Sequence, residues 1–352
     1  MPTEFAIDTA HPVAVTGANG YVASWIVQEL LDAGCTVHAT VRDPSNSRKV
    51  EHLQSLAATR PGTLKLFAAD LLTPGSFDEA LQGCKVVMHT ASPFVVRGIK
   101  DAQRELIDPA VQGTENVLRS VDRCDSVQRV VLTSSVVAIY GDVADAQGQT
   151  LDESHWNTSS SVDHQPYPRS KVAAEQAAWA IAEAQSRWDL VVINPGLVLG
   201  PALTRHSASE SLVIMGDLLK GKLRTGVPQL EIALVDVRDV AHAHVRAAFV
   251  EKAAGRHVLV NQTLTMLQMA QVIGQRFQGR FRLPKMELPK WLIWLAGPTQ
   301  GISRKFVSLN VGHKLRFDNS KSRQELGLEY RPIADTLAAH VQQMLDDGVV
   351  RG

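Results

Sequence analysis

The chain has 352 residues, and its 36 basic and 36 acidic side chains give a formal net charge of zero at pH 7. A chain without excess charge has no global field that attracts nucleic acid or an anionic membrane, so we expect neither as a partner. Its three cysteines, Cys35, Cys84 and Cys124, lack the spacing of metal ligands, and we expect reduced thiols packed in the core of a cytoplasmic protein.

The chain begins with the pattern of a strand, a glycine turn and a helix. Residues 12–16 form a short apolar run, Gly17 and Gly20 follow directly, and residues 25–31 have helical periodicity. Glycines let the backbone approach a pyrophosphate closely, and the free N–H groups at a helix start favour its negative charge. This context predicts a dinucleotide-binding turn in which Ala23 replaces the third glycine of the usual pattern.

The second predicted strand, residues 36–42, ends where a dinucleotide fold places the residue that contacts the adenosine ribose. That residue is Arg42, and arginine suits the 2′-phosphate of NADP, whereas an acid would bind the ribose hydroxyl of NAD. Lys49 adds a second cation from the next helix start. In the alternative interpretation, Arg42 is a surface charge at a strand end and Asp43 contacts the ribose.

Further apolar runs of strand length alternate with stretches of helical periodicity, at residues 64–70, 85–91, 129–135 and 190–195. Such alternation predicts a doubly wound α/β fold, with a parallel sheet covered by helices on both faces and ligands beyond the carboxyl ends of its strands. Several candidate site residues stand at these ends: Asp70, Thr90, Ala91, Ser134 and Ser135.

Tyr167 and Lys171 are four residues apart, so a helix that begins near the tyrosine presents both on one face. An ammonium group beside a phenol favours the phenolate and lowers the phenol pKa from about 10, which makes a usable proton donor at neutral pH. The pair therefore predicts the acid/base chemistry of carbonyl reduction. Because Pro168 biases the residue before it away from helical geometry, we expect Tyr167 at the helix cap.

The alternation breaks after Pro195, which suggests a second, smaller region. Residues 234–249 then resemble a strand and a helix that return to the main sheet, and His242 and His244 within them face different ways, so we expect no metal site. The expected division is a dinucleotide-binding domain at 1–195, rejoined by about 233–262, and a substrate-binding region at 196–232 and 263–352.

Taken in chain order, the motifs resemble those of the extended short-chain dehydrogenases/reductases. The shared motifs are Thr16-Gly17-x-x-Gly20, residues 41–44, 69–71, 75–80, 89–93 and 133–135, Tyr167-x-x-x-Lys171, and residues 194–195. The branch most similar contains dihydroflavonol reductases, cinnamoyl-CoA reductases and related aldehyde and ketone reductases. The resemblance covers about the first two-thirds of the chain and continues afterwards chiefly in residues 326–332.

The resemblance implies that Tyr167 donates the proton, that Lys171 binds the nicotinamide ribose and lowers the tyrosine pKa, and that Ser135 binds the carbonyl oxygen. Side chains alternate along a strand, so only one of Ser134 and Ser135 can point into the site, and the second serine carries the role in the family. NADPH is the implied cofactor. Its contacts are expected from Gly17, Asn19, Gly20, Tyr21, Val22, Arg42, Lys49, Asp70, Leu71, Thr90, Ala91, Ser92, Thr133, Tyr167, Lys171, Pro195, Gly196 and Val198.

We therefore expect a monomeric or homodimeric NADPH-dependent reductase that converts a hydrophobic aryl or alkyl aldehyde or ketone to an alcohol. Residues 92–94 and 286–294 are expected to line its hydrophobic pocket. A nucleotide-sugar epimerase or dehydratase and a hydroxysteroid dehydrogenase share the scaffold, whereas a non-catalytic, redox-sensing binding protein would need the fold without the catalytic residues. Residues 1–8 lack a signal-peptide pattern, and residues 291–296 are too few to span a bilayer.

Overall fold

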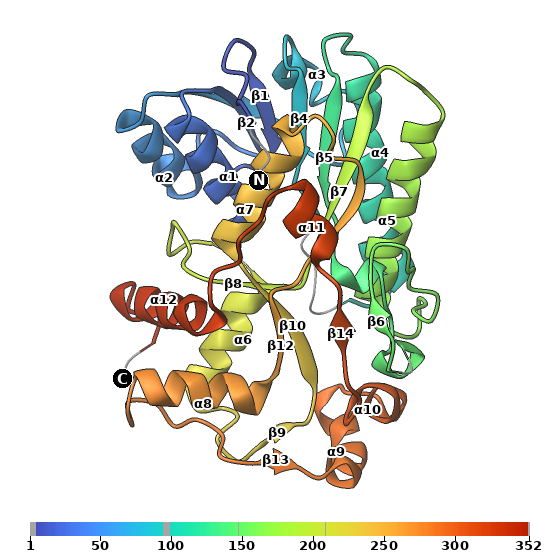
Figure 1. Cartoon of the computed structure of the whole chain (residues 1–352), viewed down its shortest axis with the longest axis vertical. Coiled ribbons are helices and arrows are strands. Elements are labelled where there is room, and N and C mark those ends of the chain that lie inside the picture. Colours follow the sequence, from blue (N-terminus) through green and yellow to red (C-terminus); the bar gives the residue numbers. More distant parts are fainter. Residues whose placement is uncertain (1–4, 94–98, 147, 208, 351–352) are drawn as a thin grey trace.

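The computed structural model describes residues 5–93, 99–146, 148–207 and 209–350. A large sheet with helices on both faces forms one half of the molecule, and a smaller α/β region lies below it in Figure 1. The large sheet has seven parallel strands in the order β11-β7-β5-β4-β1-β2-β3. The strands are β1 (Val13–Thr16), β2 (Thr36–Val41), β3 (Thr63–Ala68), β4 (Val86–His89), β5 (Arg129–Thr133), β7 (Asp189–Pro195) and β11 (Gly255–Leu259).

The predicted doubly wound fold is confirmed by the way alternate residues of each strand pack on opposite layers. Val13 and Val15 of β1 pack in the core on one side of the sheet, whereas Ala14 packs in the core on the other side. One layer consists of α1 (Tyr21–Asp32), α2 (Ser47–Ala58) and α7 (Val237–Phe249). The other consists of α3 (Asp78–Leu81), α4 (Asp108–Asp122) and α5 (Pro166–Glu183).

The order of the strands reverses between β1 and β4, so the carboxyl ends of these two neighbours leave a crevice where such sheets bind ligands. Short helical segments follow the ends of β4 and β5 along the same edge of the sheet. They are the π-helix η1 (Gln103–Ile107) before α4, and the 3₁₀ helices η2 (Val136–Ala138) and η3 (Val143–Ala146) after β5. The fold therefore places the predicted cofactor turn and Ser135 along one edge.

The smaller region is built on a three-stranded sheet in the order β12-β10-β8. It consists of β8 (Leu197–Leu199), α6 (Glu210–Leu219), β10 (Glu231–Asp236), β12 (Gln262–Thr265), α8 (Met266–Arg276) and α12 (Ile333–Asp346), which share one apolar core. Its remaining elements are β9 (Val227–Pro228), β13 (Glu287–Leu288), α9 (Lys290–Ala296), η4 (Gly297–Gln300) and α10 (Arg304–Asn310).

One predicted strand joins a different sheet from the one expected. The strand near Leu234 does not return to the large sheet, because β10 pairs with β8 and β12. The chain returns through α7, which packs against α1, and through β11, which pairs with β7. β6 (Thr150–Leu151) pairs with β14 (Arg316–Phe317), and α11 (Ser320–Glu325) then contacts β11.

All three cysteines are buried and unpaired by disulfides, as predicted. Burial raises the pKa of Cys35 to about 11 and that of Cys84 to about 12, so both thiols stay protonated at neutral pH. No helix in the described parts of the chain is long and apolar enough to cross a membrane.

Candidate active site

The turn after β1 is fixed against the end of β4. Gly17 has a φ of 62°, and a Cβ atom there would lie 3.0 Å from the Cβ of Ala91, so only glycine fits. The Thr16 hydroxyl accepts hydrogen bonds from the backbone N–H groups of Thr90 and Ala91, at 3.1 Å each. Gly20 is the N-cap of α1, and no side chain caps this helix. The first turn of α1 is thus left open to an anionic group.

The same hydroxyl determines the state of a buried histidine. Because two N–H groups occupy its lone pairs, the Thr16 hydroxyl donates its proton to Nδ1 of His89, 2.9 Å away. His89 is therefore neutral and carries its proton on Nε2. Burial lowers the pKa of His89 to about 3, and the positive charge of Lys171 adds to this effect.

The two predicted cations lie directly after β2 and in the first turn of α2. Arg42 and Lys49 are exposed, and neither forms a salt bridge within the described residues. Asp43 is differently placed, because its Oδ1 accepts hydrogen bonds from the hydroxyl and the backbone N–H of Ser45, which lower the Asp43 pKa. Arg42 is thus free to bind a phosphate, whereas the carboxylate of Asp43, the alternative contact to the ribose, already binds Ser45.

Other predicted cofactor residues fall into two groups. Asp70, Leu71, Thr90, Ala91, Ser92, Pro195 and Gly196 lie at or just after the carboxyl ends of strands of the large sheet, and Asn19 lies in the glycine turn. Tyr21, Val22, Thr133 and Val198 have side chains that are engaged in contacts within the protein.

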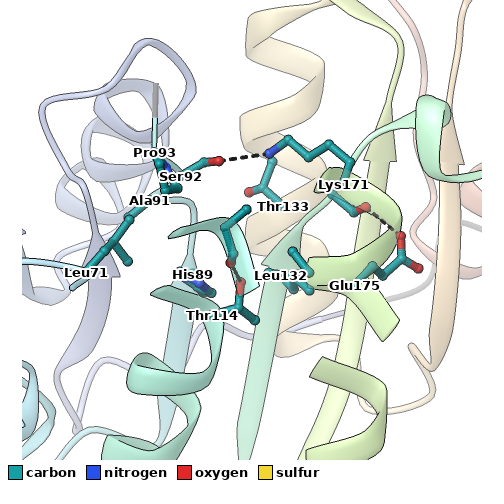
Figure 2. Close-up of a pocket in the computed structure, with 13 residues that line it drawn as sticks. Leu71, His89, Ala91, Ser92, Pro93, Thr114, Leu132, Thr133, Lys171 and Glu175 are labelled. Carbon is teal, nitrogen blue, oxygen red and sulfur yellow. Dashed lines mark hydrogen bonds between the residues drawn. The ribbon is translucent and has the colours of Figure 1, made fainter. Parts of the chain in front are cut away.

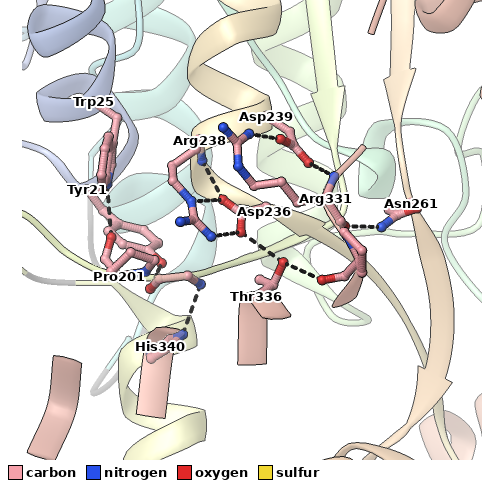
Figure 3. A network of polar contacts seen from close by, with 12 residues as sticks. Tyr21, Trp25, Pro201, Asp236, Arg238, Asp239, Asn261, Arg331, Thr336 and His340 are labelled. Atoms are coloured by element: carbon pink, nitrogen blue, oxygen red, sulfur yellow. Dashed lines mark hydrogen bonds and ion pairs between the residues drawn. The ribbon is translucent and has the colours of Figure 1, made fainter. Parts of the chain in front are cut away.

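The hydroxyl groups of Tyr21 and Thr133 form hydrogen bonds within the protein. The Tyr21 hydroxyl donates to the Gly200 carbonyl at 2.6 Å, so this side chain ties α1 to the segment after β8 (Figure 3). The Thr133 hydroxyl donates at 2.6 Å to Nε2 of His244, whose Nδ1 donates to a carbonyl of α7. The backbone of both residues remains the part that can contact a cofactor. His242 pairs instead with Glu29 of α1, so the two histidines face different elements.

Tyr167 and Lys171 lie together at the start of α5. Helix α5 begins at Pro166 with Gln165 as its N-cap, so Tyr167 is the second helical residue and not, as expected, the cap. Its side chain is 40% exposed. The Lys171 Nζ atom lies 5.8 Å from the centroid of the tyrosine ring and donates to the Ser92 hydroxyl at 3.1 Å (Figure 2).

The two serines after β5 have different surroundings. The Ser135 hydroxyl is partly exposed, accepts from the Val137 N–H at 3.3 Å and donates to the Pro195 carbonyl at 3.4 Å. The Ser134 hydroxyl is buried and donates to Glu175 at 2.5 Å. Because Ser134 is committed to this carboxylate, Ser135 is the serine whose hydroxyl can turn to a substrate.

Glu175 is a residue that the sequence analysis missed. Its buried carboxylate pairs with Arg256 of β11 at 2.6 Å and also accepts from Asn194 of β7 at 2.9 Å. Asn194 in turn donates to the backbone carbonyl of Ser135 at 3.2 Å. A glutamate four residues after Lys171 on the same helix face was a usable signal, whereas nothing in the sequence indicated its partner, Arg256.

A cavity of about 20 Å³ lies beneath the Lys171 side chain, and Figure 2 shows it between α5 and the ends of β4 and β5. His89, Thr114 and Glu175 are among the polar residues that line it. This volume suits a single water molecule, and the polar lining supplies partners for one. The ammonium group thus lies above a space lined by both polar and apolar side chains, the latter including Leu71 and Leu132.

The predicted hydrophobic pocket involves residues 92–94 and 286–294. Phe94 lies outside the described residues. Within residues 286–294, Met286 and Trp291 are exposed, and Ile293 packs on Val307 of α10. None of them lines the cavity beneath Lys171, so their role in a substrate pocket stays a prediction.

A family model described as the NAD dependent epimerase/dehydratase family matches residues 13–260. A cinnamoyl-CoA reductase of Medicago truncatula is 37% identical over 336 residues, which cover 94% of this chain and 95% of that protein. A putative anthocyanidin reductase of Ginkgo biloba is 40% identical over 286 residues, which cover 77% of this chain and 82% of that protein. The structure of yeast methylglyoxal/isovaleraldehyde reductase complexed with NADPH aligns with a TM-score of 0.78 at 28% identity, covering 96% of this chain and 100% of that one.

The Glu175–Arg256 pair yields a prediction about stability. Glu175→Gln removes one charge and leaves Arg256 buried and uncompensated, so the free energy of unfolding should fall by about 3–5 kcal/mol. Urea unfolding followed by circular dichroism measures it. The matched control is Asp189→Asn, which breaks the more exposed Arg129–Asp189 pair and should cost no more than about 1 kcal/mol. Equal losses in the two variants would contradict the special role of the buried pair.

Proposed function

We propose that this chain reduces a hydrophobic aldehyde or ketone with NADPH, because it belongs to the NAD-dependent epimerase/dehydratase family. Within that family it belongs to the extended short-chain dehydrogenase/reductase branch of cinnamoyl-CoA, anthocyanidin and dihydroflavonol reductases. The chain is an NAD(P)-dependent reductase of this family. The observation that carries the proposal is the Tyr167–Lys171 pair, which lies next to Ser92 at the edge of the sheet where the cofactor turn also ends.

The residues at this edge fit a phosphorylated dinucleotide. Gly17 and the uncapped start of α1 leave backbone N–H groups free to bind a pyrophosphate. Arg42 and Lys49 supply exposed cations for a 2′-phosphate, which NADP has and NAD lacks. The solved relative complexed with NADPH supports the same choice. When bound, the nicotinamide supplies the hydride.

The side chains of this chain then supply binding and the proton. Ser135 gives up its long hydrogen bond to the Pro195 carbonyl and donates to the substrate carbonyl oxygen. Tyr167 donates its phenolic proton to the same oxygen and completes the alcohol. Lys171 binds the nicotinamide ribose, and its ammonium charge beside the ring stabilises the phenolate that remains. Both hydrogen bonds strengthen as negative charge develops on the oxygen.

The proposed substrate is an aryl or alkyl carbonyl compound. The relatives named above are, by their names, reductases of cinnamoyl-CoA, of an anthocyanidin and of methylglyoxal or isovaleraldehyde. Burying the ring of an aryl carbonyl compound contributes roughly 25 cal/mol per Å² of apolar area to its binding, so aryl compounds should bind more tightly than smaller ones. The family description also favours a second candidate, an epimerase or dehydratase of nucleotide sugars, which would return the hydride to its substrate.

The role of Tyr167 is tested by Tyr167→Phe, which removes the hydroxyl and keeps the ring. Carbonyl reduction should fall by roughly 10²–10⁴-fold, because a positioned general acid is lost, whereas NADPH affinity should change little. Steady-state kinetics and NADPH fluorescence titration measure the two effects. If the variant keeps more than about a tenth of the wild-type kcat, Tyr167 is not the proton donor.

The choice of cofactor is tested by Arg42→Ala. The KM for NADPH should rise about 10- to 100-fold, since a hydrogen bond to a charged group contributes about 1.5–3 kcal/mol, whereas the KM for NADH should change little. Arg119→Ala is the control, because Arg119 is an exposed arginine of α4 on the opposite face of the sheet. Equal use of NADPH and NADH by the wild type would favour Asp43 as the ribose contact instead.

A further inference from the structure

The residue that precedes α5 by one position has an unusual backbone. Gln165 has a φ of 57° and is the only residue other than glycine with a positive φ in the described parts of the chain. It is the N-cap of α5, two residues before Tyr167. A left-handed backbone at a residue with a side chain costs on the order of 1–3 kcal/mol and persists only where the surroundings hold it.

The group that holds Gln165 is the buried carboxylate of Asp142. Its Oδ1 accepts from the Gln165 side-chain amide at 2.5 Å, and its Oδ2 lies 2.8 Å from Nε2 of His164. Two consecutive residues immediately before α5 are therefore tied to one carboxylate. Both contacts lie at the start of α5.

Asp142 is itself held in the loop that follows Ser135. Its backbone N–H donates to the Ser159 hydroxyl at 3.0 Å, and a Cβ atom at Gly141 would lie only 2.2 Å from that oxygen, so a larger residue there would displace the hydroxyl. The Asn157 amide donates to the carbonyl of Val137, which lies in η2 directly after Ser135. The segments that carry Ser135 and Tyr167 are thus connected through one set of polar contacts.

A third donor to Asp142 comes from the smaller region. The side-chain amide of Asn310, at the end of α10, is buried and donates to Oδ1 of Asp142 at 2.6 Å. Its oxygen accepts from the backbone N–H of Val143, the residue after Asp142. Asn310 therefore binds both the carboxylate and the backbone at this point, and α10 packs on η3 there.

We propose that Asp142 is a positioning residue that fixes the start of α5 and hence the Tyr167 hydroxyl, and that Asn310 makes this position depend on the substrate-binding region. The inference rests on the proposed function, because that function makes Tyr167 the proton donor. A carboxylate offers acceptors to all three donors, whereas an asparagine side chain would turn an NH₂ group toward one of them. Loss of the carboxylate releases Gln165 from its strained conformation and lets α5 begin elsewhere.

The kinetic test uses Asp142→Asn, Asn310→Ala and the control Asp152→Asn. Asp152 lies in the same part of the chain, and its carboxylate is half-exposed and binds Ser154 and His155. For Asp142→Asn we expect kcat to fall about 10- to 100-fold, while NADPH affinity stays within about twofold of the wild type. Because the chemical step becomes slower, the primary isotope effect measured with deuterated NADPH should rise. Asn310→Ala should lower kcat by roughly 2- to 30-fold, and Asp152→Asn should match the wild type.

A second readout does not depend on turnover. The chain contains four tyrosines, so protein labelled with 3-fluorotyrosine gives four ¹⁹F resonances, and Tyr167→Phe assigns the one of interest. The Tyr167 resonance should shift or broaden in Asp142→Asn and in Asn310→Ala, while the resonances of Tyr21 and Tyr330 stay in place. Asn310→Ala keeps the carboxylate and provides the result if Asp142→Asn does not fold.

The outcomes separate this proposal from the proposed function. An unchanged kcat, isotope effect and Tyr167 resonance in Asp142→Asn would overturn the positioning role and leave the reductase assignment intact. The positioning role would also be overturned if the lower kcat of Asp142→Asn were fully explained by a smaller fraction of folded protein, with the isotope effect and the Tyr167 resonance unchanged. A wild type that reduces no carbonyl compound would refute the proposed function, and the ¹⁹F result alone would then decide whether Asp142 positions Tyr167.

Discussion

The buried carboxylate of Glu175 is the constraint on which the arrangement of the site depends. Donors from β7, β11, α5 and the residue directly after β5 converge on it: Asn194, Arg256, Trp179 and Ser134. A buried charge with so many partners fixes the relative positions of three neighbouring strands and the helix that covers them. The contacts of Glu175 explain why Ser134 faces inward and why Ser135 remains available to a substrate. They also explain why Lys171, one helical turn earlier on α5, lies above the ends of β4 and β5.

Two buried histidines near this edge stay uncharged: His89, which lines the cavity beneath Lys171, and His244, which is bound to Thr133. His89 and His244 are each bound by a threonine hydroxyl, and burial lowers the pKa of His89 to about 3 and that of His244 to about 4. At neutral pH both are uncharged hydrogen-bonding groups. Lys171 is thus the cation beside the Tyr167 ring, which suits a site where negative charge develops on an oxygen.

The sequence allowed prediction of those features that depend on periodicity and short spacing. The strands that end at Thr16, Val41 and His89, the glycine turn and the Tyr167–Lys171 pair all follow from local patterns. The partner sheet of β10 did not, because its apolar run fits either sheet. Helix α5 includes Tyr167 because the first turn of a helix has no intrahelical use for its N–H groups, so Pro166 and Pro168 are both tolerated there. Contacts such as Asp142–Asn310 join residues 168 positions apart, and no sequence spacing indicates them.

The central claim is that a carbonyl compound receives a hydride from the cofactor and a proton from the protein. NADPH that carries deuterium at the transferred position tests it most directly, with aromatic and aliphatic aldehydes, ketones and nucleotide sugars as candidate substrates. The account predicts one deuterium on the former carbonyl carbon of an aryl or alkyl alcohol, detected by mass spectrometry, together with stoichiometric NADP⁺. Label that stays in the cofactor, combined with conversion of a nucleotide sugar without net oxidation of NADPH, would contradict it.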